Sequence, residues 1–194
     1  MTYEDRLVDV VVKLGGGVLR YPADLRAVME CICRAARRRR LLVVPGGGPF
    51  ADAVREADKA VPMGDEAAHW MAVLAMDQYA HLIVSQLPAS WLVYGPEDLV
   101  EASFAGSIPV LAPFKWLRSA DPLPHSWDVT SDSIAAWVAG ALGARELVLV
   151  KPPCAEGPTL VDAYFDRARP ALAQVNVITA DRVNDLSRIL DPRG

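Results

Sequence analysis

The stretch that decides the fold is LVDVVVKLGGG, residues 7–17, in which β-branched residues run up to Lys13 and three glycines. The pattern returns as LLVVPGGGPFAD in residues 41–52. Each apolar run predicts a buried strand, over residues 7–12 and 41–44, that ends at a glycine-rich turn. Because ligands of open α/β sheets gather at the carboxyl ends of the strands, we expect the two glycine loops to face one crevice.

The rest of the chain alternates short apolar runs with longer helical patterns. Helices are predicted over residues 22–38, 50–59, 65–86, 97–104, 159–173 and 181–190, and another opens within 128–133 and runs to 142. Strands are predicted over 91–94, 108–111, 147–151 and 175–179, and a surface loop over 114–126. This alternation predicts an α/β fold, a three-layer sandwich with a mostly parallel central sheet flanked by helices.

Composition narrows the class of protein. A chain of 194 residues with 52% hydrophobic residues is long enough for one domain, of one large core or of two lobes, and is too apolar for disorder. The net charge of -4 opposes a nucleic-acid partner. No apolar run is long enough to span a membrane, and residues 1–6 do not resemble a secretion signal. The odd set Cys31, Cys33 and Cys154 opposes a disulfide framework, so we expect a cytoplasmic protein.

Lys13 and the first glycine triplet, Gly15, Gly16 and Gly17, have the make-up of a phosphate site. Backbone without Cβ can approach an anion closely and direct several N–H groups at it, while an ammonium neutralises charge. The alternative is an ordinary glycine turn beside a solvated lysine. The second triplet, Gly46, Gly47 and Gly48, is equally weak alone, but two triplets on two strands favour a binding role.

Thr130, Ser131, Asp132 and Ser133 stand where a helix begins. Serine, threonine and aspartate are preferred N-caps, so one of these residues is expected to cap the helix. Asp132 lies beyond the expected cap, where its carboxylate could orient lysines or a metal at the crevice. The residues alone leave the capping and the chemical interpretations equally open.

Taken in order, the segments KLGGG (13–17), VVPGGGPFAD (43–52), TSD (130–132) and the strand ending at Lys151 resemble the amino acid kinase superfamily. Residues 65–72, 76–79 and 127–135 resemble its small aspartokinase-related branch. The resemblance implies an ATP-dependent phosphotransferase that uses Mg2+. Its implied acceptor is a small phosphate, aminomethyl-furanmethyl phosphate, converted to the diphosphate in methanofuran or methylofuran synthesis.

The resemblance also implies roles for individual residues. Lys13 would contact the transferring phosphoryl group, and Asp132 would orient Lys13 and Mg2+. The remaining implied roles are nucleotide binding for Gly15, Gly16, Gly17, Thr130, Ser131 and Lys151, and acceptor binding for Gly46, Gly47, Gly48, His69 and Asp77. Helical spacing puts Asp77 near the face of His69, where it could receive an ammonium group of the acceptor. For His69 the alternative is a structural role, which is the commoner one for a buried helical histidine.

The segment KPPCAEG, residues 151–157, departs from the Asp-rich turn that family members often carry there. Either Lys151 supplies a second phosphate-binding charge or the nucleotide site is weakened. Two alternatives therefore stand beside the favoured function: a kinase for another acceptor, forming an acyl phosphate or a nucleoside diphosphate, and a nucleotide-binding member without turnover. The expected lobes are residues 1–126 for the acceptor and a shortened 127–194 for the nucleotide, and relatives imply a homo-oligomer.

Overall fold

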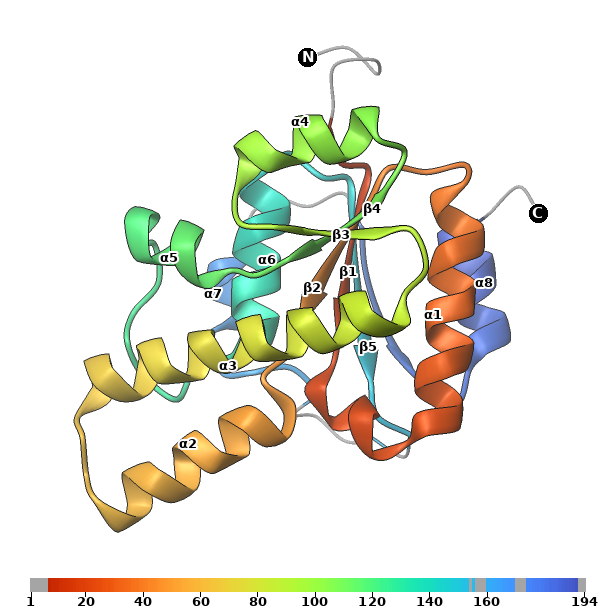
Figure 1. Cartoon of the computed structure of the whole chain (residues 1–194). Coiled ribbons are helices and arrows are strands. Elements are labelled where there is room, and N and C mark those ends of the chain that lie inside the picture. Colours follow the sequence, from red (N-terminus) through yellow and green to blue (C-terminus); the bar gives the residue numbers. More distant parts are fainter. Residues whose placement is uncertain (1–6, 154, 156–159, 170–173, 192–194) are drawn as a thin grey trace.

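The computed structural model describes residues 7–153, 155, 160–169 and 174–191, and its centre is one six-stranded sheet (Figure 1). The strands are β1 (Val10–Leu14), β2 (Leu41–Pro45), β3 (Ser90–Val93), β4 (Ile108–Leu111), β5 (Glu146–Lys151) and β6 (Gln174–Thr179). They lie in the order β3-β4-β2-β1-β5-β6, and every neighbouring pair is parallel. The predicted α/β sandwich is confirmed, with a sheet that is parallel throughout the described residues.

Helices occupy the connections between the strands, as parallel pairing requires. They are the 3-10 helix η1 (Gly16–Arg20), α1 (Pro22–Ala36), α2 (Gly48–Ala60), α3 (Asp65–Gln86), α4 (Pro96–Phe104), α5 (Phe114–Ala120), α6 (Ser131–Ala141), α7 (Phe165–Ala168) and α8 (Val183–Leu190). Among the described residues, no helix combines the length and the apolar character needed to cross a membrane.

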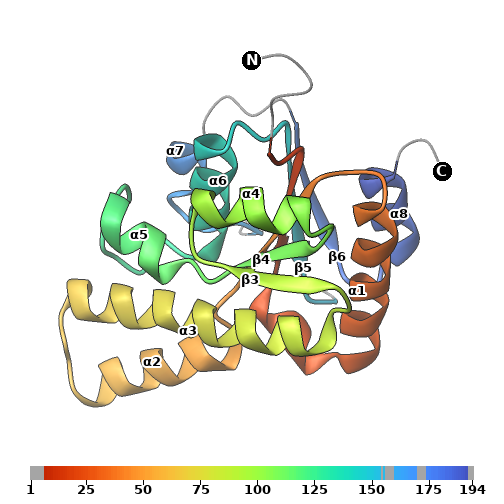
Figure 2. The same ribbon diagram turned by 45° about the horizontal axis from the view of Figure 1, so that its top comes forward.

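Helices cover both faces of the sheet, and α2 and α3 lie side by side at the edge of the molecule (Figures 1 and 2). Alternate residues of β1 belong to two separate apolar clusters. Val10 and Val12 pack with α1 and α8, whereas Val11 packs with α4, α5 and α6. Helix α3 contributes to both clusters, the first half to one and the second half to the other.

Two predicted elements differ in the structure. The loop expected over 114–126 contains α5, whose N-terminal amide, Phe114 N–H, donates to Asp77 Oδ1 at 3.0 Å and whose Leu117 is buried. This stabilisation comes from a distant helix, so no local signal announces it. Of the helix expected over 159–173, the described part is helical at Phe165–Ala168, and 160–164 is not. Residues 1–6, Cys154, 156–159 and 170–173 lie outside the described residues.

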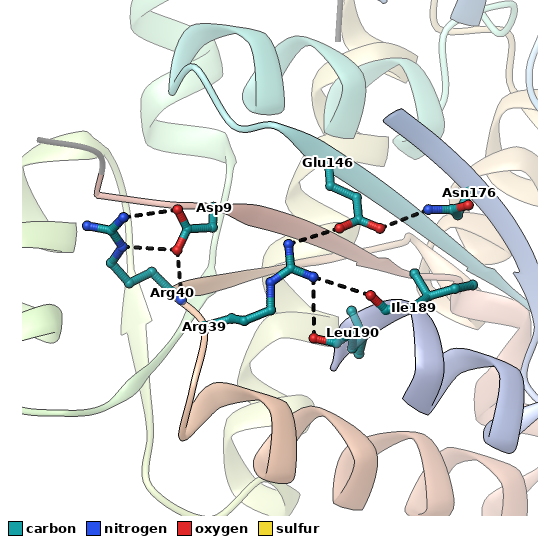
Figure 3. A network of polar contacts seen from close by, with 7 residues as sticks. All are labelled: Asp9, Arg39, Arg40, Glu146, Asn176, Ile189 and Leu190. Atoms are coloured by element: carbon teal, nitrogen blue, oxygen red, sulfur yellow. Dashed lines mark hydrogen bonds and ion pairs between the residues drawn. The ribbon is translucent and has the colours of Figure 1, made fainter. Parts of the chain in front are cut away.

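Four consecutive arginines, residues 37–40, follow α1, and two of them form ion pairs that reach the sheet. Arg39 forms an ion pair with Glu146 at 3.0 Å and donates to the carbonyls of Ile189 and Leu190 (Figure 3). Arg40 holds Asp9 through two side-chain bonds, at 3.1 and 3.0 Å. Since Asp9 precedes β1 and Glu146 begins β5, these contacts join the amino ends of the strands, opposite the glycine loops.

Candidate active site

The two glycine loops touch at the carboxyl ends of β1 and β2. The register pairs Leu14 with Pro45, and Gly46 N–H donates to the Leu14 carbonyl at 2.8 Å. A Cβ on Gly16 would overlap the backbone nitrogen of Gly48, and Gly48 itself has a φ of +56°, a conformation that favours glycine. The structure therefore brings the loops together as expected, and the contact depends on the missing side chains.

A cavity of about 310 Å³ opens over these loops, between η1, α2, α3 and the segment 126–134. Seven of the predicted site residues line it: Gly16, Gly17, Gly47, Gly48, His69, Thr130 and Ser131. Ala72, Val73 and Met76 of α3 and Ile134 of α6 give it apolar walls. The volume suits a small molecule, because ligand pockets commonly start near 300 Å³.

Beside the loops, one carboxylate bridges two buried lysines. Lys13 Nζ lies 2.7 Å from Asp132 Oδ1, and Lys151 Nζ lies 2.6 Å from Asp132 Oδ2. Lys13 pairs in register with Leu149, so Lys151, two residues further along β5, points to the same face as Lys13. Helix α6 covers that face and places Asp132 between them. All three residues are less than 9% exposed.

This cluster carries a net charge of about one positive unit in a site from which water is largely excluded. Burial alone would raise the pKa of Asp132, but Lys13 and Lys151 outweigh it and hold that pKa below its usual value. Burial, with the neighbouring charge of Lys13, lowers the pKa of Lys151, while Asp132 opposes the shift. The arrangement attracts an anion, and a polyanion such as a phosphate chain most of all.

The amino end of α6 is held by a residue that sequence reasoning missed. Thr130 is the N-cap residue, yet its hydroxyl does not bond to the helix. Instead Asp162 accepts hydrogen bonds from Thr130 N–H at 2.9 Å and from Ser133 N–H at 3.0 Å, and also from both hydroxyls. The expected cap thus comes from a separate segment, and nothing in residues 128–133 could have identified it.

His69 lies on the cavity wall within a group of rings. Its imidazole stacks on that of His125 with centroids 4.6 Å apart and meets the indole of Trp70 edge-on at 4.9 Å. His125 in turn lies 2.8 Å from Asp121. Burial and the neighbouring His125 lower the pKa of His69 to about 4, so its ring is neutral at pH 7. A neutral imidazole can still donate one hydrogen bond to a ligand.

Five predicted site residues do not line the cavity: Lys13, Gly15, Gly46, Asp132 and Lys151. Gly46 lies against Gly16 and Ser131, which do line it, and Gly15 lies against Lys151. Asp77 is placed differently, because it does not line the cavity and its Oδ1 accepts the bond from α5. Burial raises the pKa of Asp77 to about 6. An acceptor-binding role for Asp77 stays a prediction.

Sequence reasoning also missed the charged group at the cavity mouth. Asp52 bridges Arg20 at 2.9 Å and Arg55 at 3.1 Å, and all three line the cavity. The Arg55 guanidinium lies 4.8 Å from the ring centre of Trp127. Arg20 and Arg55 each follow a glycine triplet by a few residues, which was the available signal.

Metal coordination by the chain itself does not fit these residues. Among the described residues, no group of three or more His, Cys, Asp or Glu is arranged to hold a metal ion. Asp132 accepts a hydrogen bond from a lysine at each oxygen, so its carboxylate is shared between Lys13 and Lys151, and the orientation of Mg2+ that the resemblance implied for it stays a prediction.

Known proteins resemble this chain in sequence and in fold. The pattern that defines the Amino acid kinase family matches residues 10–152. A [5-(aminomethyl)furan-3-yl]methyl phosphate kinase from Methanocaldococcus jannaschii is 28% identical over 183 residues, which cover 92% of this chain and 78% of the relative. The solved uridylate kinase of Archaeoglobus fulgidus superposes with a TM-score of 0.68 at 15% identity, covering 94% of this chain and 95% of its own. The UMP kinase of Ureaplasma parvum gives 0.71 at 14%, covering 95% of each chain.

Proposed function

We propose, because the chain belongs to the amino acid kinase family and is thus an ATP-dependent phosphotransferase, that its acceptor is an aminomethyl-furanmethyl phosphate. The reaction would convert this phosphate monoester to the diphosphate, as a step in methanofuran or methylofuran synthesis. The proposal for the acceptor is supported by the relative from Methanocaldococcus jannaschii, which aligns with 92% of this chain.

One observation carries the catalytic proposal: the buried Lys13–Asp132–Lys151 cluster lies against the meeting point of two glycine loops. Phosphoryl transfer needs positioned positive charge more than acid–base chemistry, because the charge on the transferring group is spread over its oxygens. A phosphate acceptor is already anionic and needs no base to activate it. A net positive, water-poor cluster is the electrostatic environment that such a transfer requires.

In the proposed mechanism each glycine loop holds one reactant. The backbone N–H groups of Gly16 and Gly17, with Ser131 at the start of α6, bind the nucleotide phosphates. Gly47 and Gly48 bind the acceptor phosphate, and the neutral ring of His69 donates to it. Gly15, Gly46 and Thr130 fix the shape of the site, since their N–H groups donate to the Val150 carbonyl, the Leu14 carbonyl and Asp162. Because the loops touch, attacking oxygen and γ-phosphorus are brought together in line across the junction.

Lys13 stabilises the transferring phosphoryl group, and Lys151 neutralises the nucleotide oxygen that becomes the leaving group. Asp132 holds both ammonium groups in place and is a positioning residue. Mg2+ would accompany ATP, and its oxygen ligands would come from the nucleotide. The presence of Lys151 in this cluster favours turnover over the alternative of a nucleotide-binding member without activity. The division into an acceptor-binding lobe, residues 1–126, and a nucleotide-binding lobe, residues 127–194, stays a prediction. Strands β1 and β5, one from each expected lobe, are neighbours in the same sheet.

The test is ADP release by purified protein with Mg-ATP and one acceptor at a time: aminomethyl-furanmethyl phosphate, UMP, and acetylglutamate. Turnover with the furan phosphate, at a kcat/KM at least tenfold above the others, and a diphosphate product identified by mass spectrometry are expected. Lys13→Met should abolish the activity, while Lys115→Met, an exposed lysine on α5, serves as the matched control. Preference for UMP or acetylglutamate would refute the acceptor, and nucleotide binding without turnover would refute the kinase.

A further inference from the structure

We propose that Arg20 and Arg55, held in place by Asp52 and Trp127, bind the anionic group of the acceptor, whose flat apolar body lies against Trp127. This inference rests on the proposed function, because it names the side chains that recognise the acceptor of that reaction. It assigns the acceptor to a chemical class, the phosphate monoesters of small ring-containing alcohols.

The charges on the cavity wall point to an anionic ligand. Among the described residues that line the cavity, the positively charged side chains are those of Arg20 and Arg55, and the negatively charged side chain is that of Asp52. Their sum is about one positive unit. Lys13 and Lys151 are buried and share Asp132, so an acceptor at the mouth of the cavity meets the arginines first. A phosphate monoester carries close to two negative charges at neutral pH, which two guanidinium groups complement.

The two arginines are pre-positioned. One carboxylate oxygen of Asp52 accepts a hydrogen bond from Arg20 and the other accepts one from Arg55, so Asp52 sets the spacing of the two guanidinium groups. Each of these bonds uses one donor of a guanidinium that has five, which leaves donors for a second anion. The side chains remain partly open to solvent, at 70% for Arg20 and 42% for Arg55. An incoming phosphate can therefore reach them without displacing Asp52.

Trp127 gives this group an aromatic support. Its ring lies 4.8 Å from the guanidinium carbon of Arg55, a cation–π distance, and its Nε1 donates to Asp58 Oδ2 at 3.1 Å. Indole and guanidinium are thus both held by α2, and both line the cavity with the neutral ring of His69. A ring attached to the phosphate would pack against the indole and the imidazole, whereas a branched or strongly polar acceptor would leave the apolar surface of these rings exposed to water.

The position favours the acceptor over the nucleotide. Asp52 and Arg55 belong to α2, whose first residue is Gly48 of the loop proposed to hold the acceptor phosphate. Arg20 belongs to η1, which follows the other loop, but its guanidinium donates to Asp52 of α2 and is therefore turned toward the acceptor side. The acceptor phosphate would thus have backbone N–H groups on one side and two guanidinium groups on the other.

The test measures binding without turnover, by calorimetric titration of the full-length protein with benzyl phosphate, a stable aromatic monoester. We expect Arg55→Gln to weaken binding at least tenfold, Arg20→Gln at least threefold, and Trp127→Ala to weaken benzyl phosphate more than inorganic phosphate. Arg188→Gln is the matched control, because it breaks the same kind of i,i+3 arginine–aspartate pair on α8, and it should bind as the wild type does. Melting temperatures of all variants should stay close to the wild type.

Two binding results would overturn the inference: no binding of benzyl phosphate to the wild type, or binding to the Arg20→Gln/Arg55→Gln double variant within twofold of the wild type. Steady-state kinetics gives the second readout, in which the KM for the furan phosphate rises in the arginine variants and the KM for Mg-ATP does not. Arginine-dependent binding without any turnover would refute the proposed kinase and leave the anion site standing. Turnover with unchanged acceptor KM in both variants would refute the anion site alone.

Discussion

Removing one charge at a time from the Lys13–Asp132–Lys151 cluster should separate what stabilises the fold from what performs the transfer. We expect Asp132→Asn to lower the free energy of unfolding and Lys151→Met to leave it nearly unchanged. Both variants should lose phosphoryl transfer by about 10²–10³-fold in kcat, the usual loss when a preorganised charge is removed from a transition state.

The magnitudes follow from the geometry of the cluster. The two Nζ atoms lie 2.7 and 2.6 Å from the two oxygens of one carboxylate. Two like charges that share a carboxylate in this way, about 5–7 Å apart, repel by about 2–3 kcal/mol at an effective dielectric constant of about 20. In Asp132→Asn nothing compensates this repulsion, and a loss of about 3–5 kcal/mol is expected. Lys151→Met gives up an attraction of about 4 kcal/mol to Asp132 but removes both the repulsion and the burial of one ion, so the change should stay within about 1 kcal/mol.

Urea denaturation followed by circular dichroism measures stability, and ADP release measures transfer, with Lys115→Met as the surface control. The reasoning would be refuted if Lys151→Met lost as much stability as Asp132→Asn, because the cluster would then be a structural clamp. It would be refuted equally if Lys151→Met stayed folded and kept activity within threefold of the wild type.

Three further changes test other parts of the structure. Since burial raises the pKa of Asp77 to about 6, the folded protein holds that proton longer than the unfolded chain, so the contribution of Asp77 to stability should fall by about 1–2 kcal/mol as pH rises from about 4 to 6. His69, whose pKa is lowered to about 4, contributes in the opposite direction, so the fall is measured as the difference between the wild type and Asp77→Asn. Asp77→Asn should remove that fall, seen in melting curves across this range. Gly16→Ala should cost about 1–3 kcal/mol and reduce transfer, because its Cβ would push apart the contact with Gly48. Arg39→Met should cost about 2 kcal/mol by releasing the buried Glu146, with kcat unchanged.

Each of these has a result that contradicts it. An unchanged pH profile in Asp77→Asn would show that another group titrates. Gly16→Ala should be compared with Gly95→Ala, where the added Cβ meets the movable end of a glutamate; equal effects of the two would show that the loop contact is unimportant. A fall of kcat in Arg39→Met would mean that the network in Figure 3 acts on the site across the sheet.

The sequence by itself determined the fold class and the region of the site. Alternating strand and helix patterns follow from local periodicity, and a glycine triplet after a buried strand marks a close backbone approach wherever it occurs. Both signals lie within a few neighbouring residues. For that reason local patterns predict the two loops and the crevice, whereas a chemical role for Asp132 was as open as helix capping until the family resemblance implied it.

Tertiary structure decided which side chains meet. Lys151 reaches Lys13 because the register of β1 and β5 turns both to the face that α6 covers. Asp162 caps α6 from a separate segment, and Asp77 accepts a hydrogen bond from the first residue of α5. These contacts join residues far apart in the chain, so they depend on strand register and helix packing, which local sequence patterns do not encode. The types of residue thus indicated the chemistry of the site, whereas the register of the strands and the packing of the helices fixed its geometry.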